Sequence, residues 1–276
     1  MESIQRVKPV RPAAGYIGGK RNLARRLCAL IDSIEHDGYA EPFVGMGGIF
    51  LRRSTQPAAE IINDISGDVV TFFRVLQEHY PYFTDMLRWR LASRNEFQRL
   101  VGQDPNRLTD LQRAARFLYI QRLAFGGKVS GRSFGVSRER AAPISMTKLE
   151  PLLADLHDRL QGVWIEQLPF AEFVRRYDRP GMLFYCDPPY YGCEDDYGTK
   201  LFSREDFAEL AELAAAARGK VIISINDQPE VREIFAGLER LPIETTYTLN
   251  SKGPQRVGEL VIANFAMDEG ALRAAA

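Results

Sequence analysis

The chain has 276 residues, 45% of them hydrophobic and 26% charged, and its 36 Lys and Arg balance 36 Asp and Glu. This composition excludes a disordered chain, which needs low hydrophobicity and a high net charge, and it also excludes collagen-like and coiled-coil sequences. The length predicts one large domain, or a core domain with a sizeable insertion.

The cysteines and the N-terminal residues indicate where the protein works. Cys28, Cys186 and Cys193 cannot form a disulfide framework, and their spacing fits no common zinc site. The basic residues 1–12 are not followed by the apolar segment of a signal peptide, and no apolar run reaches the ~18 residues of a membrane span. We therefore expect a reduced, cytoplasmic protein without a bound metal or a membrane segment.

The balanced net charge hides an uneven distribution along the chain. Residues 86–140 contain twelve Lys and Arg against four Asp and Glu, and residues 1–26 contain seven against one. The segments 27–85 and 141–276 are acidic in compensation. A basic region on an otherwise acidic protein indicates a surface for a polyanion such as nucleic acid, although solvated Arg-rich helices give the same pattern.

The first half of the chain begins with the pattern of a nucleotide-binding βαβ unit. A strand over 39–44 leads into a Gly-rich turn, a second strand over 60–64 follows, and a helix is expected over 68–79. Gly45 and Gly47 allow a sharp turn and a close approach to a ligand. Gly48 directly after Gly47 breaks the dinucleotide fingerprint, so hydride chemistry with NAD is disfavoured.

Asp64 ends the second predicted strand of this unit. A carboxylate at this place can accept hydrogen bonds from both hydroxyls of a ribose. A tight turn with a helix-capping Asp would produce the same pattern, so the pair of Gly-rich turn and Asp is by itself a weak signal.

Residues 81–160 interrupt the α/β alternation. Their period is largely helical and they are rich in Arg, and four glycines fall within 125–136 among basic and aromatic residues. This composition predicts an exposed hairpin or loop. We expect an inserted region over 81–160 between the two parts of a core domain, 1–80 and 161–276.

The α/β pattern resumes after the insertion and ends in an antiparallel pair. A helix capped by Ser203, with acids in its first turn, is expected to run to about Arg218. The Ala-rich tail 270–276 is expected to be frayed. The strands expected in this half are 163–168, 182–186, 220–225, 244–249 and 259–265.

Asp187-Pro188-Pro189-Tyr190 directly follows the predicted buried strand 182–186. Two prolines make a rigid turn without backbone donors, so the Pro188 carbonyl is expected to point outward. This carbonyl and the Asp187 carboxylate are two acceptors, which suit the two donors of a planar NH2 group, and Tyr190 offers a face for a flat ring. The tetrapeptide favours attack by an exocyclic or amide nitrogen on an electrophile; the plain alternative is a Pro-Pro turn with a capping Asp.

These motifs resemble those of the Dam-like, D12 class of DNA adenine-N6 methyltransferases. Asp187-Pro188-Pro189-Tyr190 matches the catalytic motif of that family, Glu41-Pro42-Phe43-Val44-Gly45-Met46-Gly47 matches its S-adenosylmethionine motif, and Gly18-Gly19-Lys20 after Tyr16 is similar to its N-terminal motif. The basic insertion between the Gly motif and the catalytic motif corresponds to the α-type order. The segments 224–227 and 256–260 are similar to later family segments less strictly.

The resemblance extends from Tyr16 to about Phe265 and implies an α/β fold. That fold is a Rossmann-like S-adenosylmethionine-dependent methyltransferase sheet with an inserted, mostly helical, basic target-recognition region. Asp64 would hold the ribose, Lys20 would face the methionine carboxylate, and Phe43 would pack under the cofactor. The residues implied at the cofactor site are Tyr16, Gly18, Lys20, Glu41, Phe43, Gly45, Gly47, Asp64 and Asp187.

The implied acceptor is the N6 amino group of an adenine in double-stranded DNA. Asp187 and the Pro188 carbonyl would grip this group, Pro189 would stiffen the turn, and Tyr190 would stack on the base, which must leave the duplex to reach the site. The resemblance implies a monomer, which could act beside a nuclease of the same specificity. The residues expected to contact DNA are Arg88, Arg94, Arg122, Phe125, Lys128, Arg132 and Phe134.

Other acceptors stay open at this point. The tetrapeptide alone does not separate adenine N6 from cytosine N4, from an RNA adenine or from a protein glutamine, although a glutamine enzyme usually has Asn in place of Asp187. A non-catalytic DNA-binding protein on the same fold is a further alternative. The intact Lys20, Asp64 and Asp187 argue against it.

Overall fold

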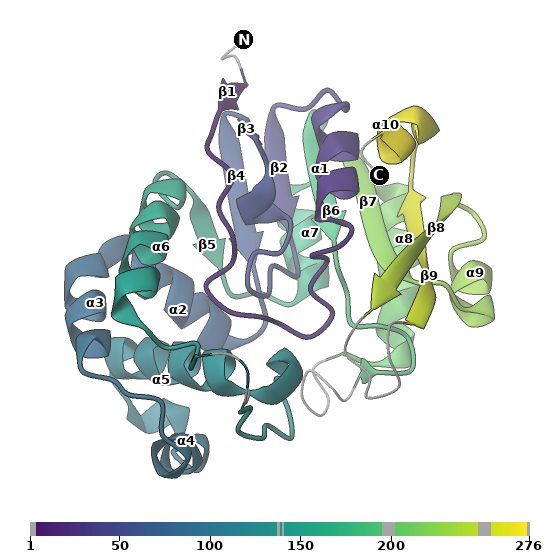
Figure 1. Ribbon diagram of the computed structural model, residues 1–276. Helices are drawn as coiled ribbons and strands as arrows, with labels where there is room; N and C mark the ends of the chain where they lie inside the picture. Colours follow the sequence, from purple (N-terminus) through teal and green to yellow (C-terminus); the bar gives the residue numbers. More distant parts are fainter. Residues whose placement is uncertain (1–3, 137–138, 140, 195–201, 248–254, 275–276) are drawn as a thin grey trace.

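A computed structural model describes residues 4–136, 139, 141–194, 202–247 and 255–274. Within them a seven-stranded sheet has the order β5-β4-β2-β6-β7-β9-β8 (Figure 1). The first five of these strands are parallel and β9 is antiparallel to both β7 and β8. The strands are β2 (Gly38–Glu41), β4 (Ala59–Asn63), β5 (Trp164–Glu166), β6 (Met182–Cys186), β7 (Lys220–Asn226), β8 (Glu239–Tyr247) and β9 (Gln255–Ala263).

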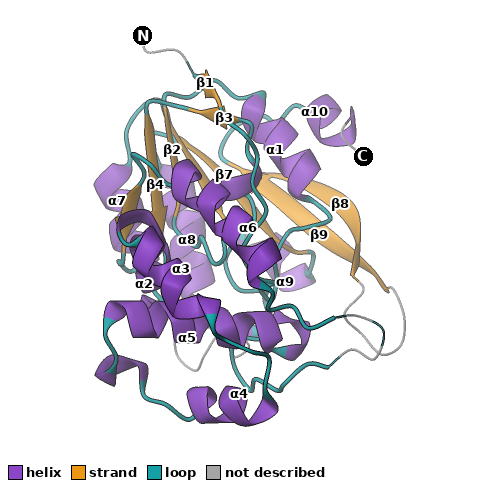
Figure 2. Ribbon diagram, turned by 60° about the vertical axis from the view of Figure 1, so that its left-hand side comes forward, coloured by secondary structure: helices purple, strands orange, loops and turns teal. Residues whose placement is uncertain are grey.

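Helices cover both faces of this sheet (Figure 2). One face packs against α7 (Phe170–Tyr177), α8 (Arg204–Ala216) and α9 (Pro229–Ile234). The other face packs against α1 (Ala24–Asp32), α2 (Gly67–Glu78), α6 (Met146–Arg159) and α10 (Glu269–Ala274). The expected Rossmann-like α/β class is thereby confirmed, because a mostly parallel sheet must be covered on both faces.

Between β4 and β5 the described residues form α2 and then four further helices, which lie at one end of the sheet (Figure 1). These four are α3 (Tyr80–Arg88), α4 (Arg94–Val101), α5 (Asp110–Leu123) and α6, and the basic segment 86–140 includes α4 and α5. Phe83 of α3 and Phe117 of α5 pack on Phe72 of α2, each with ring centroids 6.0 Å apart. Much of this region therefore shares the core of the sheet, and a smaller cluster around Phe97 and Tyr119 joins α4 to α5.

Short elements complete the chain. Strand β1 (Gln5–Arg6) pairs antiparallel with β3 (Thr55–Gln56), and the 3-10 turns are η1 (Phe50–Arg52), η2 (Pro105–Arg107) and η3 (Phe125–Gly127). Helix α8 begins at the predicted cap Ser203, whose side chain forms a capping box with Asp206, and it ends two residues before Arg218. Reciprocal capping satisfies two of the amide donors that every helix start leaves open.

Three expectations near the C-terminus were wrong. Strand β9 covers Gln255–Ala263 instead of 259–265. Strand β8 starts at Glu239 instead of 244. Pro242 does not prevent this earlier start, because β8 is an edge strand that pairs with β9 alone, and proline is tolerated on such a strand. The expected end of the strand, residue 249, lies outside the described residues. Much of the Ala-rich tail is helix α10, in which Leu272 is fully buried and its carbonyl accepts a hydrogen bond from Arg26 Nε at 2.9 Å. Packing against α1 orders the tail.

Candidate active site

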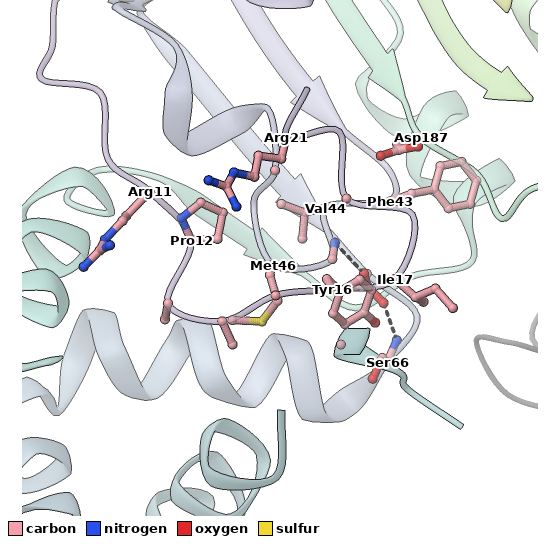
Figure 3. A pocket seen from close by; sticks show the side chains of 18 of the residues that line it. Arg11, Pro12, Tyr16, Ile17, Arg21, Phe43, Val44, Met46, Ser66 and Asp187 are labelled. Atoms are coloured by element: carbon pink, nitrogen blue, oxygen red, sulfur yellow. Dashed lines mark hydrogen bonds between the residues drawn. The ribbon is translucent and has the colours of Figure 1, made fainter. Parts of the chain in front are cut away.

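A cavity of about 710 Å³ lies at the carboxyl ends of β2, β4 and β6 (Figure 3). This volume is in the range of small-molecule sites, and the edge is where α/β sheets bind ligands. Its walls come from the N-terminal segment, the Gly-rich turn, the end of β4, the end of α5 and the turn that begins with Asp187-Pro188-Pro189. The lining includes Arg11–Ile17, Gly19, Arg21, Phe43–Met46, Arg52, Asp64–Ser66, Arg122, Asp187, Pro189 and Phe202.

The Gly-rich turn is held against Asp64 by backbone hydrogen bonds. Gly45 N donates to Asp64 Oδ2 at 2.9 Å, and Ser66 N donates to Oδ1 at 2.8 Å. Each carboxylate oxygen keeps a further lone pair for a ligand. Burial raises the pKa of Asp64 to about 6, while both amide donors lower it. Asp64 therefore stabilises the turn, and it also faces the cavity.

The two predicted glycines are required by geometry. Gly45 has φ +51°, and a Cβ there would lie 3.2 Å from the Tyr16 ring, which itself lines the cavity. Gly47 has φ +75°, and a Cβ there would lie 2.7 Å from Leu51. Positive φ and close neighbours together exclude ordinary side chains at these positions.

Phe43 belongs to an aromatic group at the Asp187 end of the cavity (Figure 3). Its ring centroid lies 5.4 Å from that of Phe170 and 5.7 Å from that of Phe202. Such packing gives the cavity a fixed apolar wall, suited to a flat ring or a methyl group.

Asp187 follows the fully buried strand β6 and reaches the cavity, and the next two prolines are buried. Its side chain is 23% exposed, and its Oδ1 lies 3.0 Å from Lys20 Nζ. Burial raises the pKa of Asp187 to about 6; the Lys20 ammonium lowers it and the Glu259 charge raises it. A hydrogen-bond acceptor at the start of a proline-stiffened turn thus faces the cavity.

Lys20 differs from the expectation that it would face the cofactor. Its side chain is 0% exposed, and its ammonium contacts Glu259 Oε1 at 2.5 Å and the Tyr190 hydroxyl at 3.1 Å in addition to Asp187. Among the described residues it is not part of the cavity lining, whose cations are Arg11, Arg21, Arg52 and Arg122. Its three N–H donors face three protein oxygens, so the ammonium lies behind Asp187.

Glu41 also lies beneath the cavity rather than in its lining, as far as the described residues go. It is 2% exposed, and its carboxyl accepts a hydrogen bond from the Tyr39 hydroxyl at 2.6 Å. Burial raises its pKa to about 8. Gly18 has φ +70° and allows the turn before Lys20, but it is likewise not among the lining residues described.

Two residues without a predicted role, Glu259 and Asn226, hold the turn that follows Asp187. Glu259 Oε2 accepts a hydrogen bond from the Tyr190 hydroxyl at 2.8 Å, and the Asn226 amide bonds both the N–H and the carbonyl of Tyr191, at 2.9 and 3.0 Å. The signal in the sequence was the looser similarity of the segments 224–227 and 256–260, which contain Asn226 and Glu259, to later segments of the family. Tyr190 points its hydroxyl toward this group and is not among the described lining residues.

The residues expected to contact DNA occupy different environments. Phe125 is 63% exposed and Lys128 is exposed, whereas Phe134 is half-buried against Phe97 with ring centroids 5.4 Å apart. Residue Arg132 is half-buried, and its Nε donates to the Lys128 carbonyl at 3.3 Å. The hairpin expected over 125–136 is closed by a bridge between Ala124 and Phe134.

The remaining arginines on that list are engaged within the protein. Arg88 pairs with Asp85 at 3.1 Å, and the Arg94 guanidinium lies 4.9 Å from the centroid of the Phe134 ring. Arg122 binds the carbonyls of Pro143 and Ala13 and lines the cavity. Burial lowers the pKa of Arg122. Its contacts fix the N-terminal segment over the cavity.

A family model for D12 class N6 adenine-specific DNA methyltransferases matches residues 16–249. The chain belongs to this family. The resemblance read from the motifs is thus confirmed, and so are the enzyme class and the reaction: a D12 methyltransferase acts on the N6 amino group of adenine in DNA. The family also implies the use of S-adenosylmethionine.

Curated relatives of this D12 methyltransferase carry matching names. It is 24% identical to the Type II methyltransferase M1.LlaDCHI of Lactococcus lactis subsp. cremoris, over 93% of this chain and 96% of that protein. The DNA N-6-adenine-methyltransferase of Escherichia phage P1 is 26% identical over 90% of this chain but only 35% of its own length. The retron Ec67 DNA adenine methylase of Escherichia coli is 24% identical over 71% of this chain and 70% of its own.

Two of the solved structures that match this chain have only a weak likeness to it. One is the precorrin 8w decarboxylase of Methanobacterium thermoautotrophicum, 9% identical with a TM-score of 0.37, over 88% of this chain and 89% of that one.

Within the described part of the chain, no helix is long and apolar enough to cross a membrane. The same residues contain no group of three or more His, Cys, Asp and Glu that could hold a metal ion.

Proposed function

We propose that the cavity binds S-adenosylmethionine and that Asp187 receives an adenine flipped out of duplex DNA. The observation that carries this proposal is the arrangement of two carboxylates on one cavity, Asp64 next to the Gly-rich turn and Asp187 at the end of the next strand but one. One suits ribose hydroxyls and the other suits an amino group.

The residues present fit the cofactor. A cavity of about 710 Å³ accommodates a nucleoside carrying an amino-acid chain, and Gly45 leaves the backbone open to close approach. Phe43 supplies an apolar wall, and Asp64 is already oriented by two amide donors. Tyr16, Gly45, Asp64 and Asp187 are the cofactor contacts that we propose, with Gly18, Glu41 and Gly47 shaping the site from behind.

In this proposal Asp187 and the Pro188 carbonyl accept the two N–H groups of adenine N6. Two acceptors in fixed positions draw these hydrogens to one side and turn the nitrogen lone pair toward the cavity. Pro189 keeps the turn rigid, and Tyr190 supports it from the buried side. When bound, S-adenosylmethionine supplies a methyl group that the positive charge on its sulfur activates toward the nitrogen.

The DNA interface is proposed to include the insertion 81–160, with Phe125 and Lys128 as its exposed members at the cavity edge. Gly126 and Gly127, which follow Phe125 directly, line the cavity. A base that leaves the duplex must pass this edge. Action as a cytoplasmic monomer, with or without a nuclease of the same specificity, stays a prediction.

The test is transfer of a labelled methyl group from S-adenosylmethionine to unmethylated duplex DNA, followed by separation of the nucleosides. We expect N6-methyladenine. Detection of N4-methylcytosine would agree with the proposed geometry of the site but would show that the acceptor base is cytosine and not adenine. Label on RNA or protein but not on DNA would overturn the acceptor, and cofactor binding without any transfer would favour a non-catalytic DNA-binding protein.

Replacing Asp64 with alanine should weaken cofactor binding. The substitution removes a charged acceptor for ribose and leaves two amide donors unpaired, so the dissociation constant should rise about 10- to 100-fold. Calorimetric titration with S-adenosylmethionine measures this directly. Asp64→Asn, which keeps one acceptor oxygen, should give an intermediate value, and unchanged affinity in the alanine variant would remove Asp64 from the proposed site.

Replacing Lys128 with alanine should weaken DNA binding at every sequence and reduce the slope of log affinity against log salt by about one. Arg175→Ala is the matched control, because Arg175 lies on α7 behind the sheet and pairs with Glu209 at 2.7 Å. Fluorescence anisotropy over a salt series provides the slopes. Equal slopes for the Lys128 variant and the wild type would show that the loop does not contact phosphates.

A further inference from the structure

Behind Asp187 lies a buried ionic cluster made from distant parts of the chain. Lys20 Nζ lies between Asp187 Oδ1, at 3.0 Å, and Glu259 Oε1, at 2.5 Å. Tyr190 donates its hydroxyl to the other oxygen of Glu259 at 2.8 Å. The side chains of Lys20 and Glu259 are both 0% exposed, whereas that of Asp187 is 23% exposed, so one buried ammonium lies between a buried carboxylate and one that reaches the cavity.

Stability alone gives a poor reason for this arrangement. A buried ion pair gains little over apolar packing, because removing each charge from water costs several kcal/mol. Lys20 and Asp187 would already form a neutral pair. Glu259 brings a second carboxylate to the same ammonium, and its repulsion of Asp187 opposes the attraction between Lys20 and Asp187. With both carboxylates ionised, the cluster carries one negative charge in excess next to the cavity.

We propose that Glu259 is a positioning residue for methyl transfer. Glu259 and Asp187 both bind the Lys20 ammonium, so Lys20 neutralises Asp187 only in part and the Asp187 carboxylate stays a strong acceptor for the adenine amino group. Glu259 also fixes the Tyr190 side chain, which belongs to the same turn as Asp187. This inference rests on the proposed role of Asp187.

The sheet makes this positioning rigid. Glu259 on β9 pairs in register with Asn226 on β7. Asn226 binds the backbone of Tyr191 through both its amide oxygen and its amide nitrogen. Two neighbouring strands thus hold consecutive residues of the turn, one by the Tyr190 hydroxyl and the other by the Tyr191 backbone. The turn cannot shift without breaking contacts to both strands.

Glu259 also controls the charge around Asp187. The charged or titratable groups that act on Asp187 or respond to it are Lys20, Glu259, Glu41, Tyr185 and Cys186. The Glu259 charge raises the pKa of Asp187, which burial brings to about 6, and the Lys20 ammonium lowers it. Removing the Glu259 charge must therefore lower the pKa of Asp187.

The experiment compares Glu259→Gln with the wild type in single-turnover methyl transfer to duplex DNA as a function of pH. We expect the plateau rate to fall about 10- to 100-fold, because small misplacements of a reacting group have effects of that size. The acid limb of the profile should move to lower pH. The dissociation constant for S-adenosylmethionine should stay within about threefold of the wild type, since Glu259 is buried behind the cavity.

Two further variants separate positioning from general damage. Glu166→Gln is the matched control, because Glu166 is likewise a carboxylate on a strand and accepts a tyrosine hydroxyl, that of Tyr177 at 2.5 Å. This variant should keep the wild-type profile. Tyr190→Phe removes the hydroxyl but keeps the Glu259 charge, so its plateau rate should fall and its acid limb should stay in place.

A wild-type plateau rate or an unmoved acid limb in Glu259→Gln would overturn the inference. If that variant does not fold, Tyr190→Phe carries the test, and a wild-type rate there would overturn it. Failure of the proposed function is distinguishable, because in that case the wild type itself transfers no methyl group to DNA, or Asp187→Ala remains active.

Discussion

Asp187→Ala is expected to lose at least about 99% of methyl transfer while the protein stays folded and binds DNA. The variant lacks one of the two acceptors that orient the adenine amino group, and preorganised groups of this kind contribute about 10²–10³-fold each. The fold should survive because Lys20 keeps Glu259 as its partner, so no buried charge is left alone. The measurement is single-turnover transfer at saturating cofactor.

Asp187→Asn is the matched variant. It keeps the shape and one acceptor oxygen but loses the charge, so its rate should lie between those of the alanine variant and the wild type. Circular dichroism and calorimetric cofactor titration serve as controls on folding and binding. Retention of more than a few per cent of activity in Asp187→Ala would contradict the role assigned to this carboxylate.

Lys20→Met should shift the pH dependence in the direction opposite to Glu259→Gln. The Lys20 ammonium lowers the pKa of Asp187, which is about 6 in the intact cluster, so its removal raises that pKa. A larger share of Asp187 is then protonated at neutral pH and unable to accept. Transfer at pH 7 should fall about tenfold or more and recover partly as the pH rises toward 9.

The same substitution should affect stability with the opposite pH trend. Asp187 and Glu259 lose their shared cation, and breaking a buried pair in this way costs about 3–5 kcal/mol when both stay ionised. The pKa of such a carboxyl is higher in the folded protein than its value of about 4 in the unfolded chain. Its contribution to folding stability therefore falls as the pH rises between these two pKa values. Urea denaturation should therefore find the variant closer to the wild type at about pH 5.5 than at pH 8.

This prediction distinguishes two roles for Lys20. If the ammonium held the methionine carboxylate, as the motif alone suggested, the loss would fall on the dissociation constant for S-adenosylmethionine, with no shift in the acid limb. If the Lys20 ammonium lies behind Asp187, as in the structure, the acid limb of the pH profile moves and the dissociation constant for S-adenosylmethionine changes little. An unmoved limb together with a large loss of affinity would contradict the cluster.

The amino-acid sequence by itself determined the local parts of the site. Gly45 and Gly47 turn the chain after a strand because only glycine tolerates their positive φ beside close neighbours. Asp187-Pro188-Pro189-Tyr190 forms a rigid turn because proline restricts the backbone of adjacent residues. Asp64 comes to the cavity because successive parallel strands end at the same edge of a sheet. Each of these features depends on residues close together in the chain.

The tertiary structure decided which side chains meet across long separations. Lys20 and Glu259 are 239 residues apart, and their contact depends on β9 inserting antiparallel beside β7. No spacing in the sequence reports this contact, so Lys20 was expected at the cofactor and Glu259 was given no role. Glu41, a polar residue of the cofactor motif, is likewise buried against Tyr39. Backbone conformation follows from local residue types, whereas the partner of a buried charge is chosen by the packing of the whole sheet.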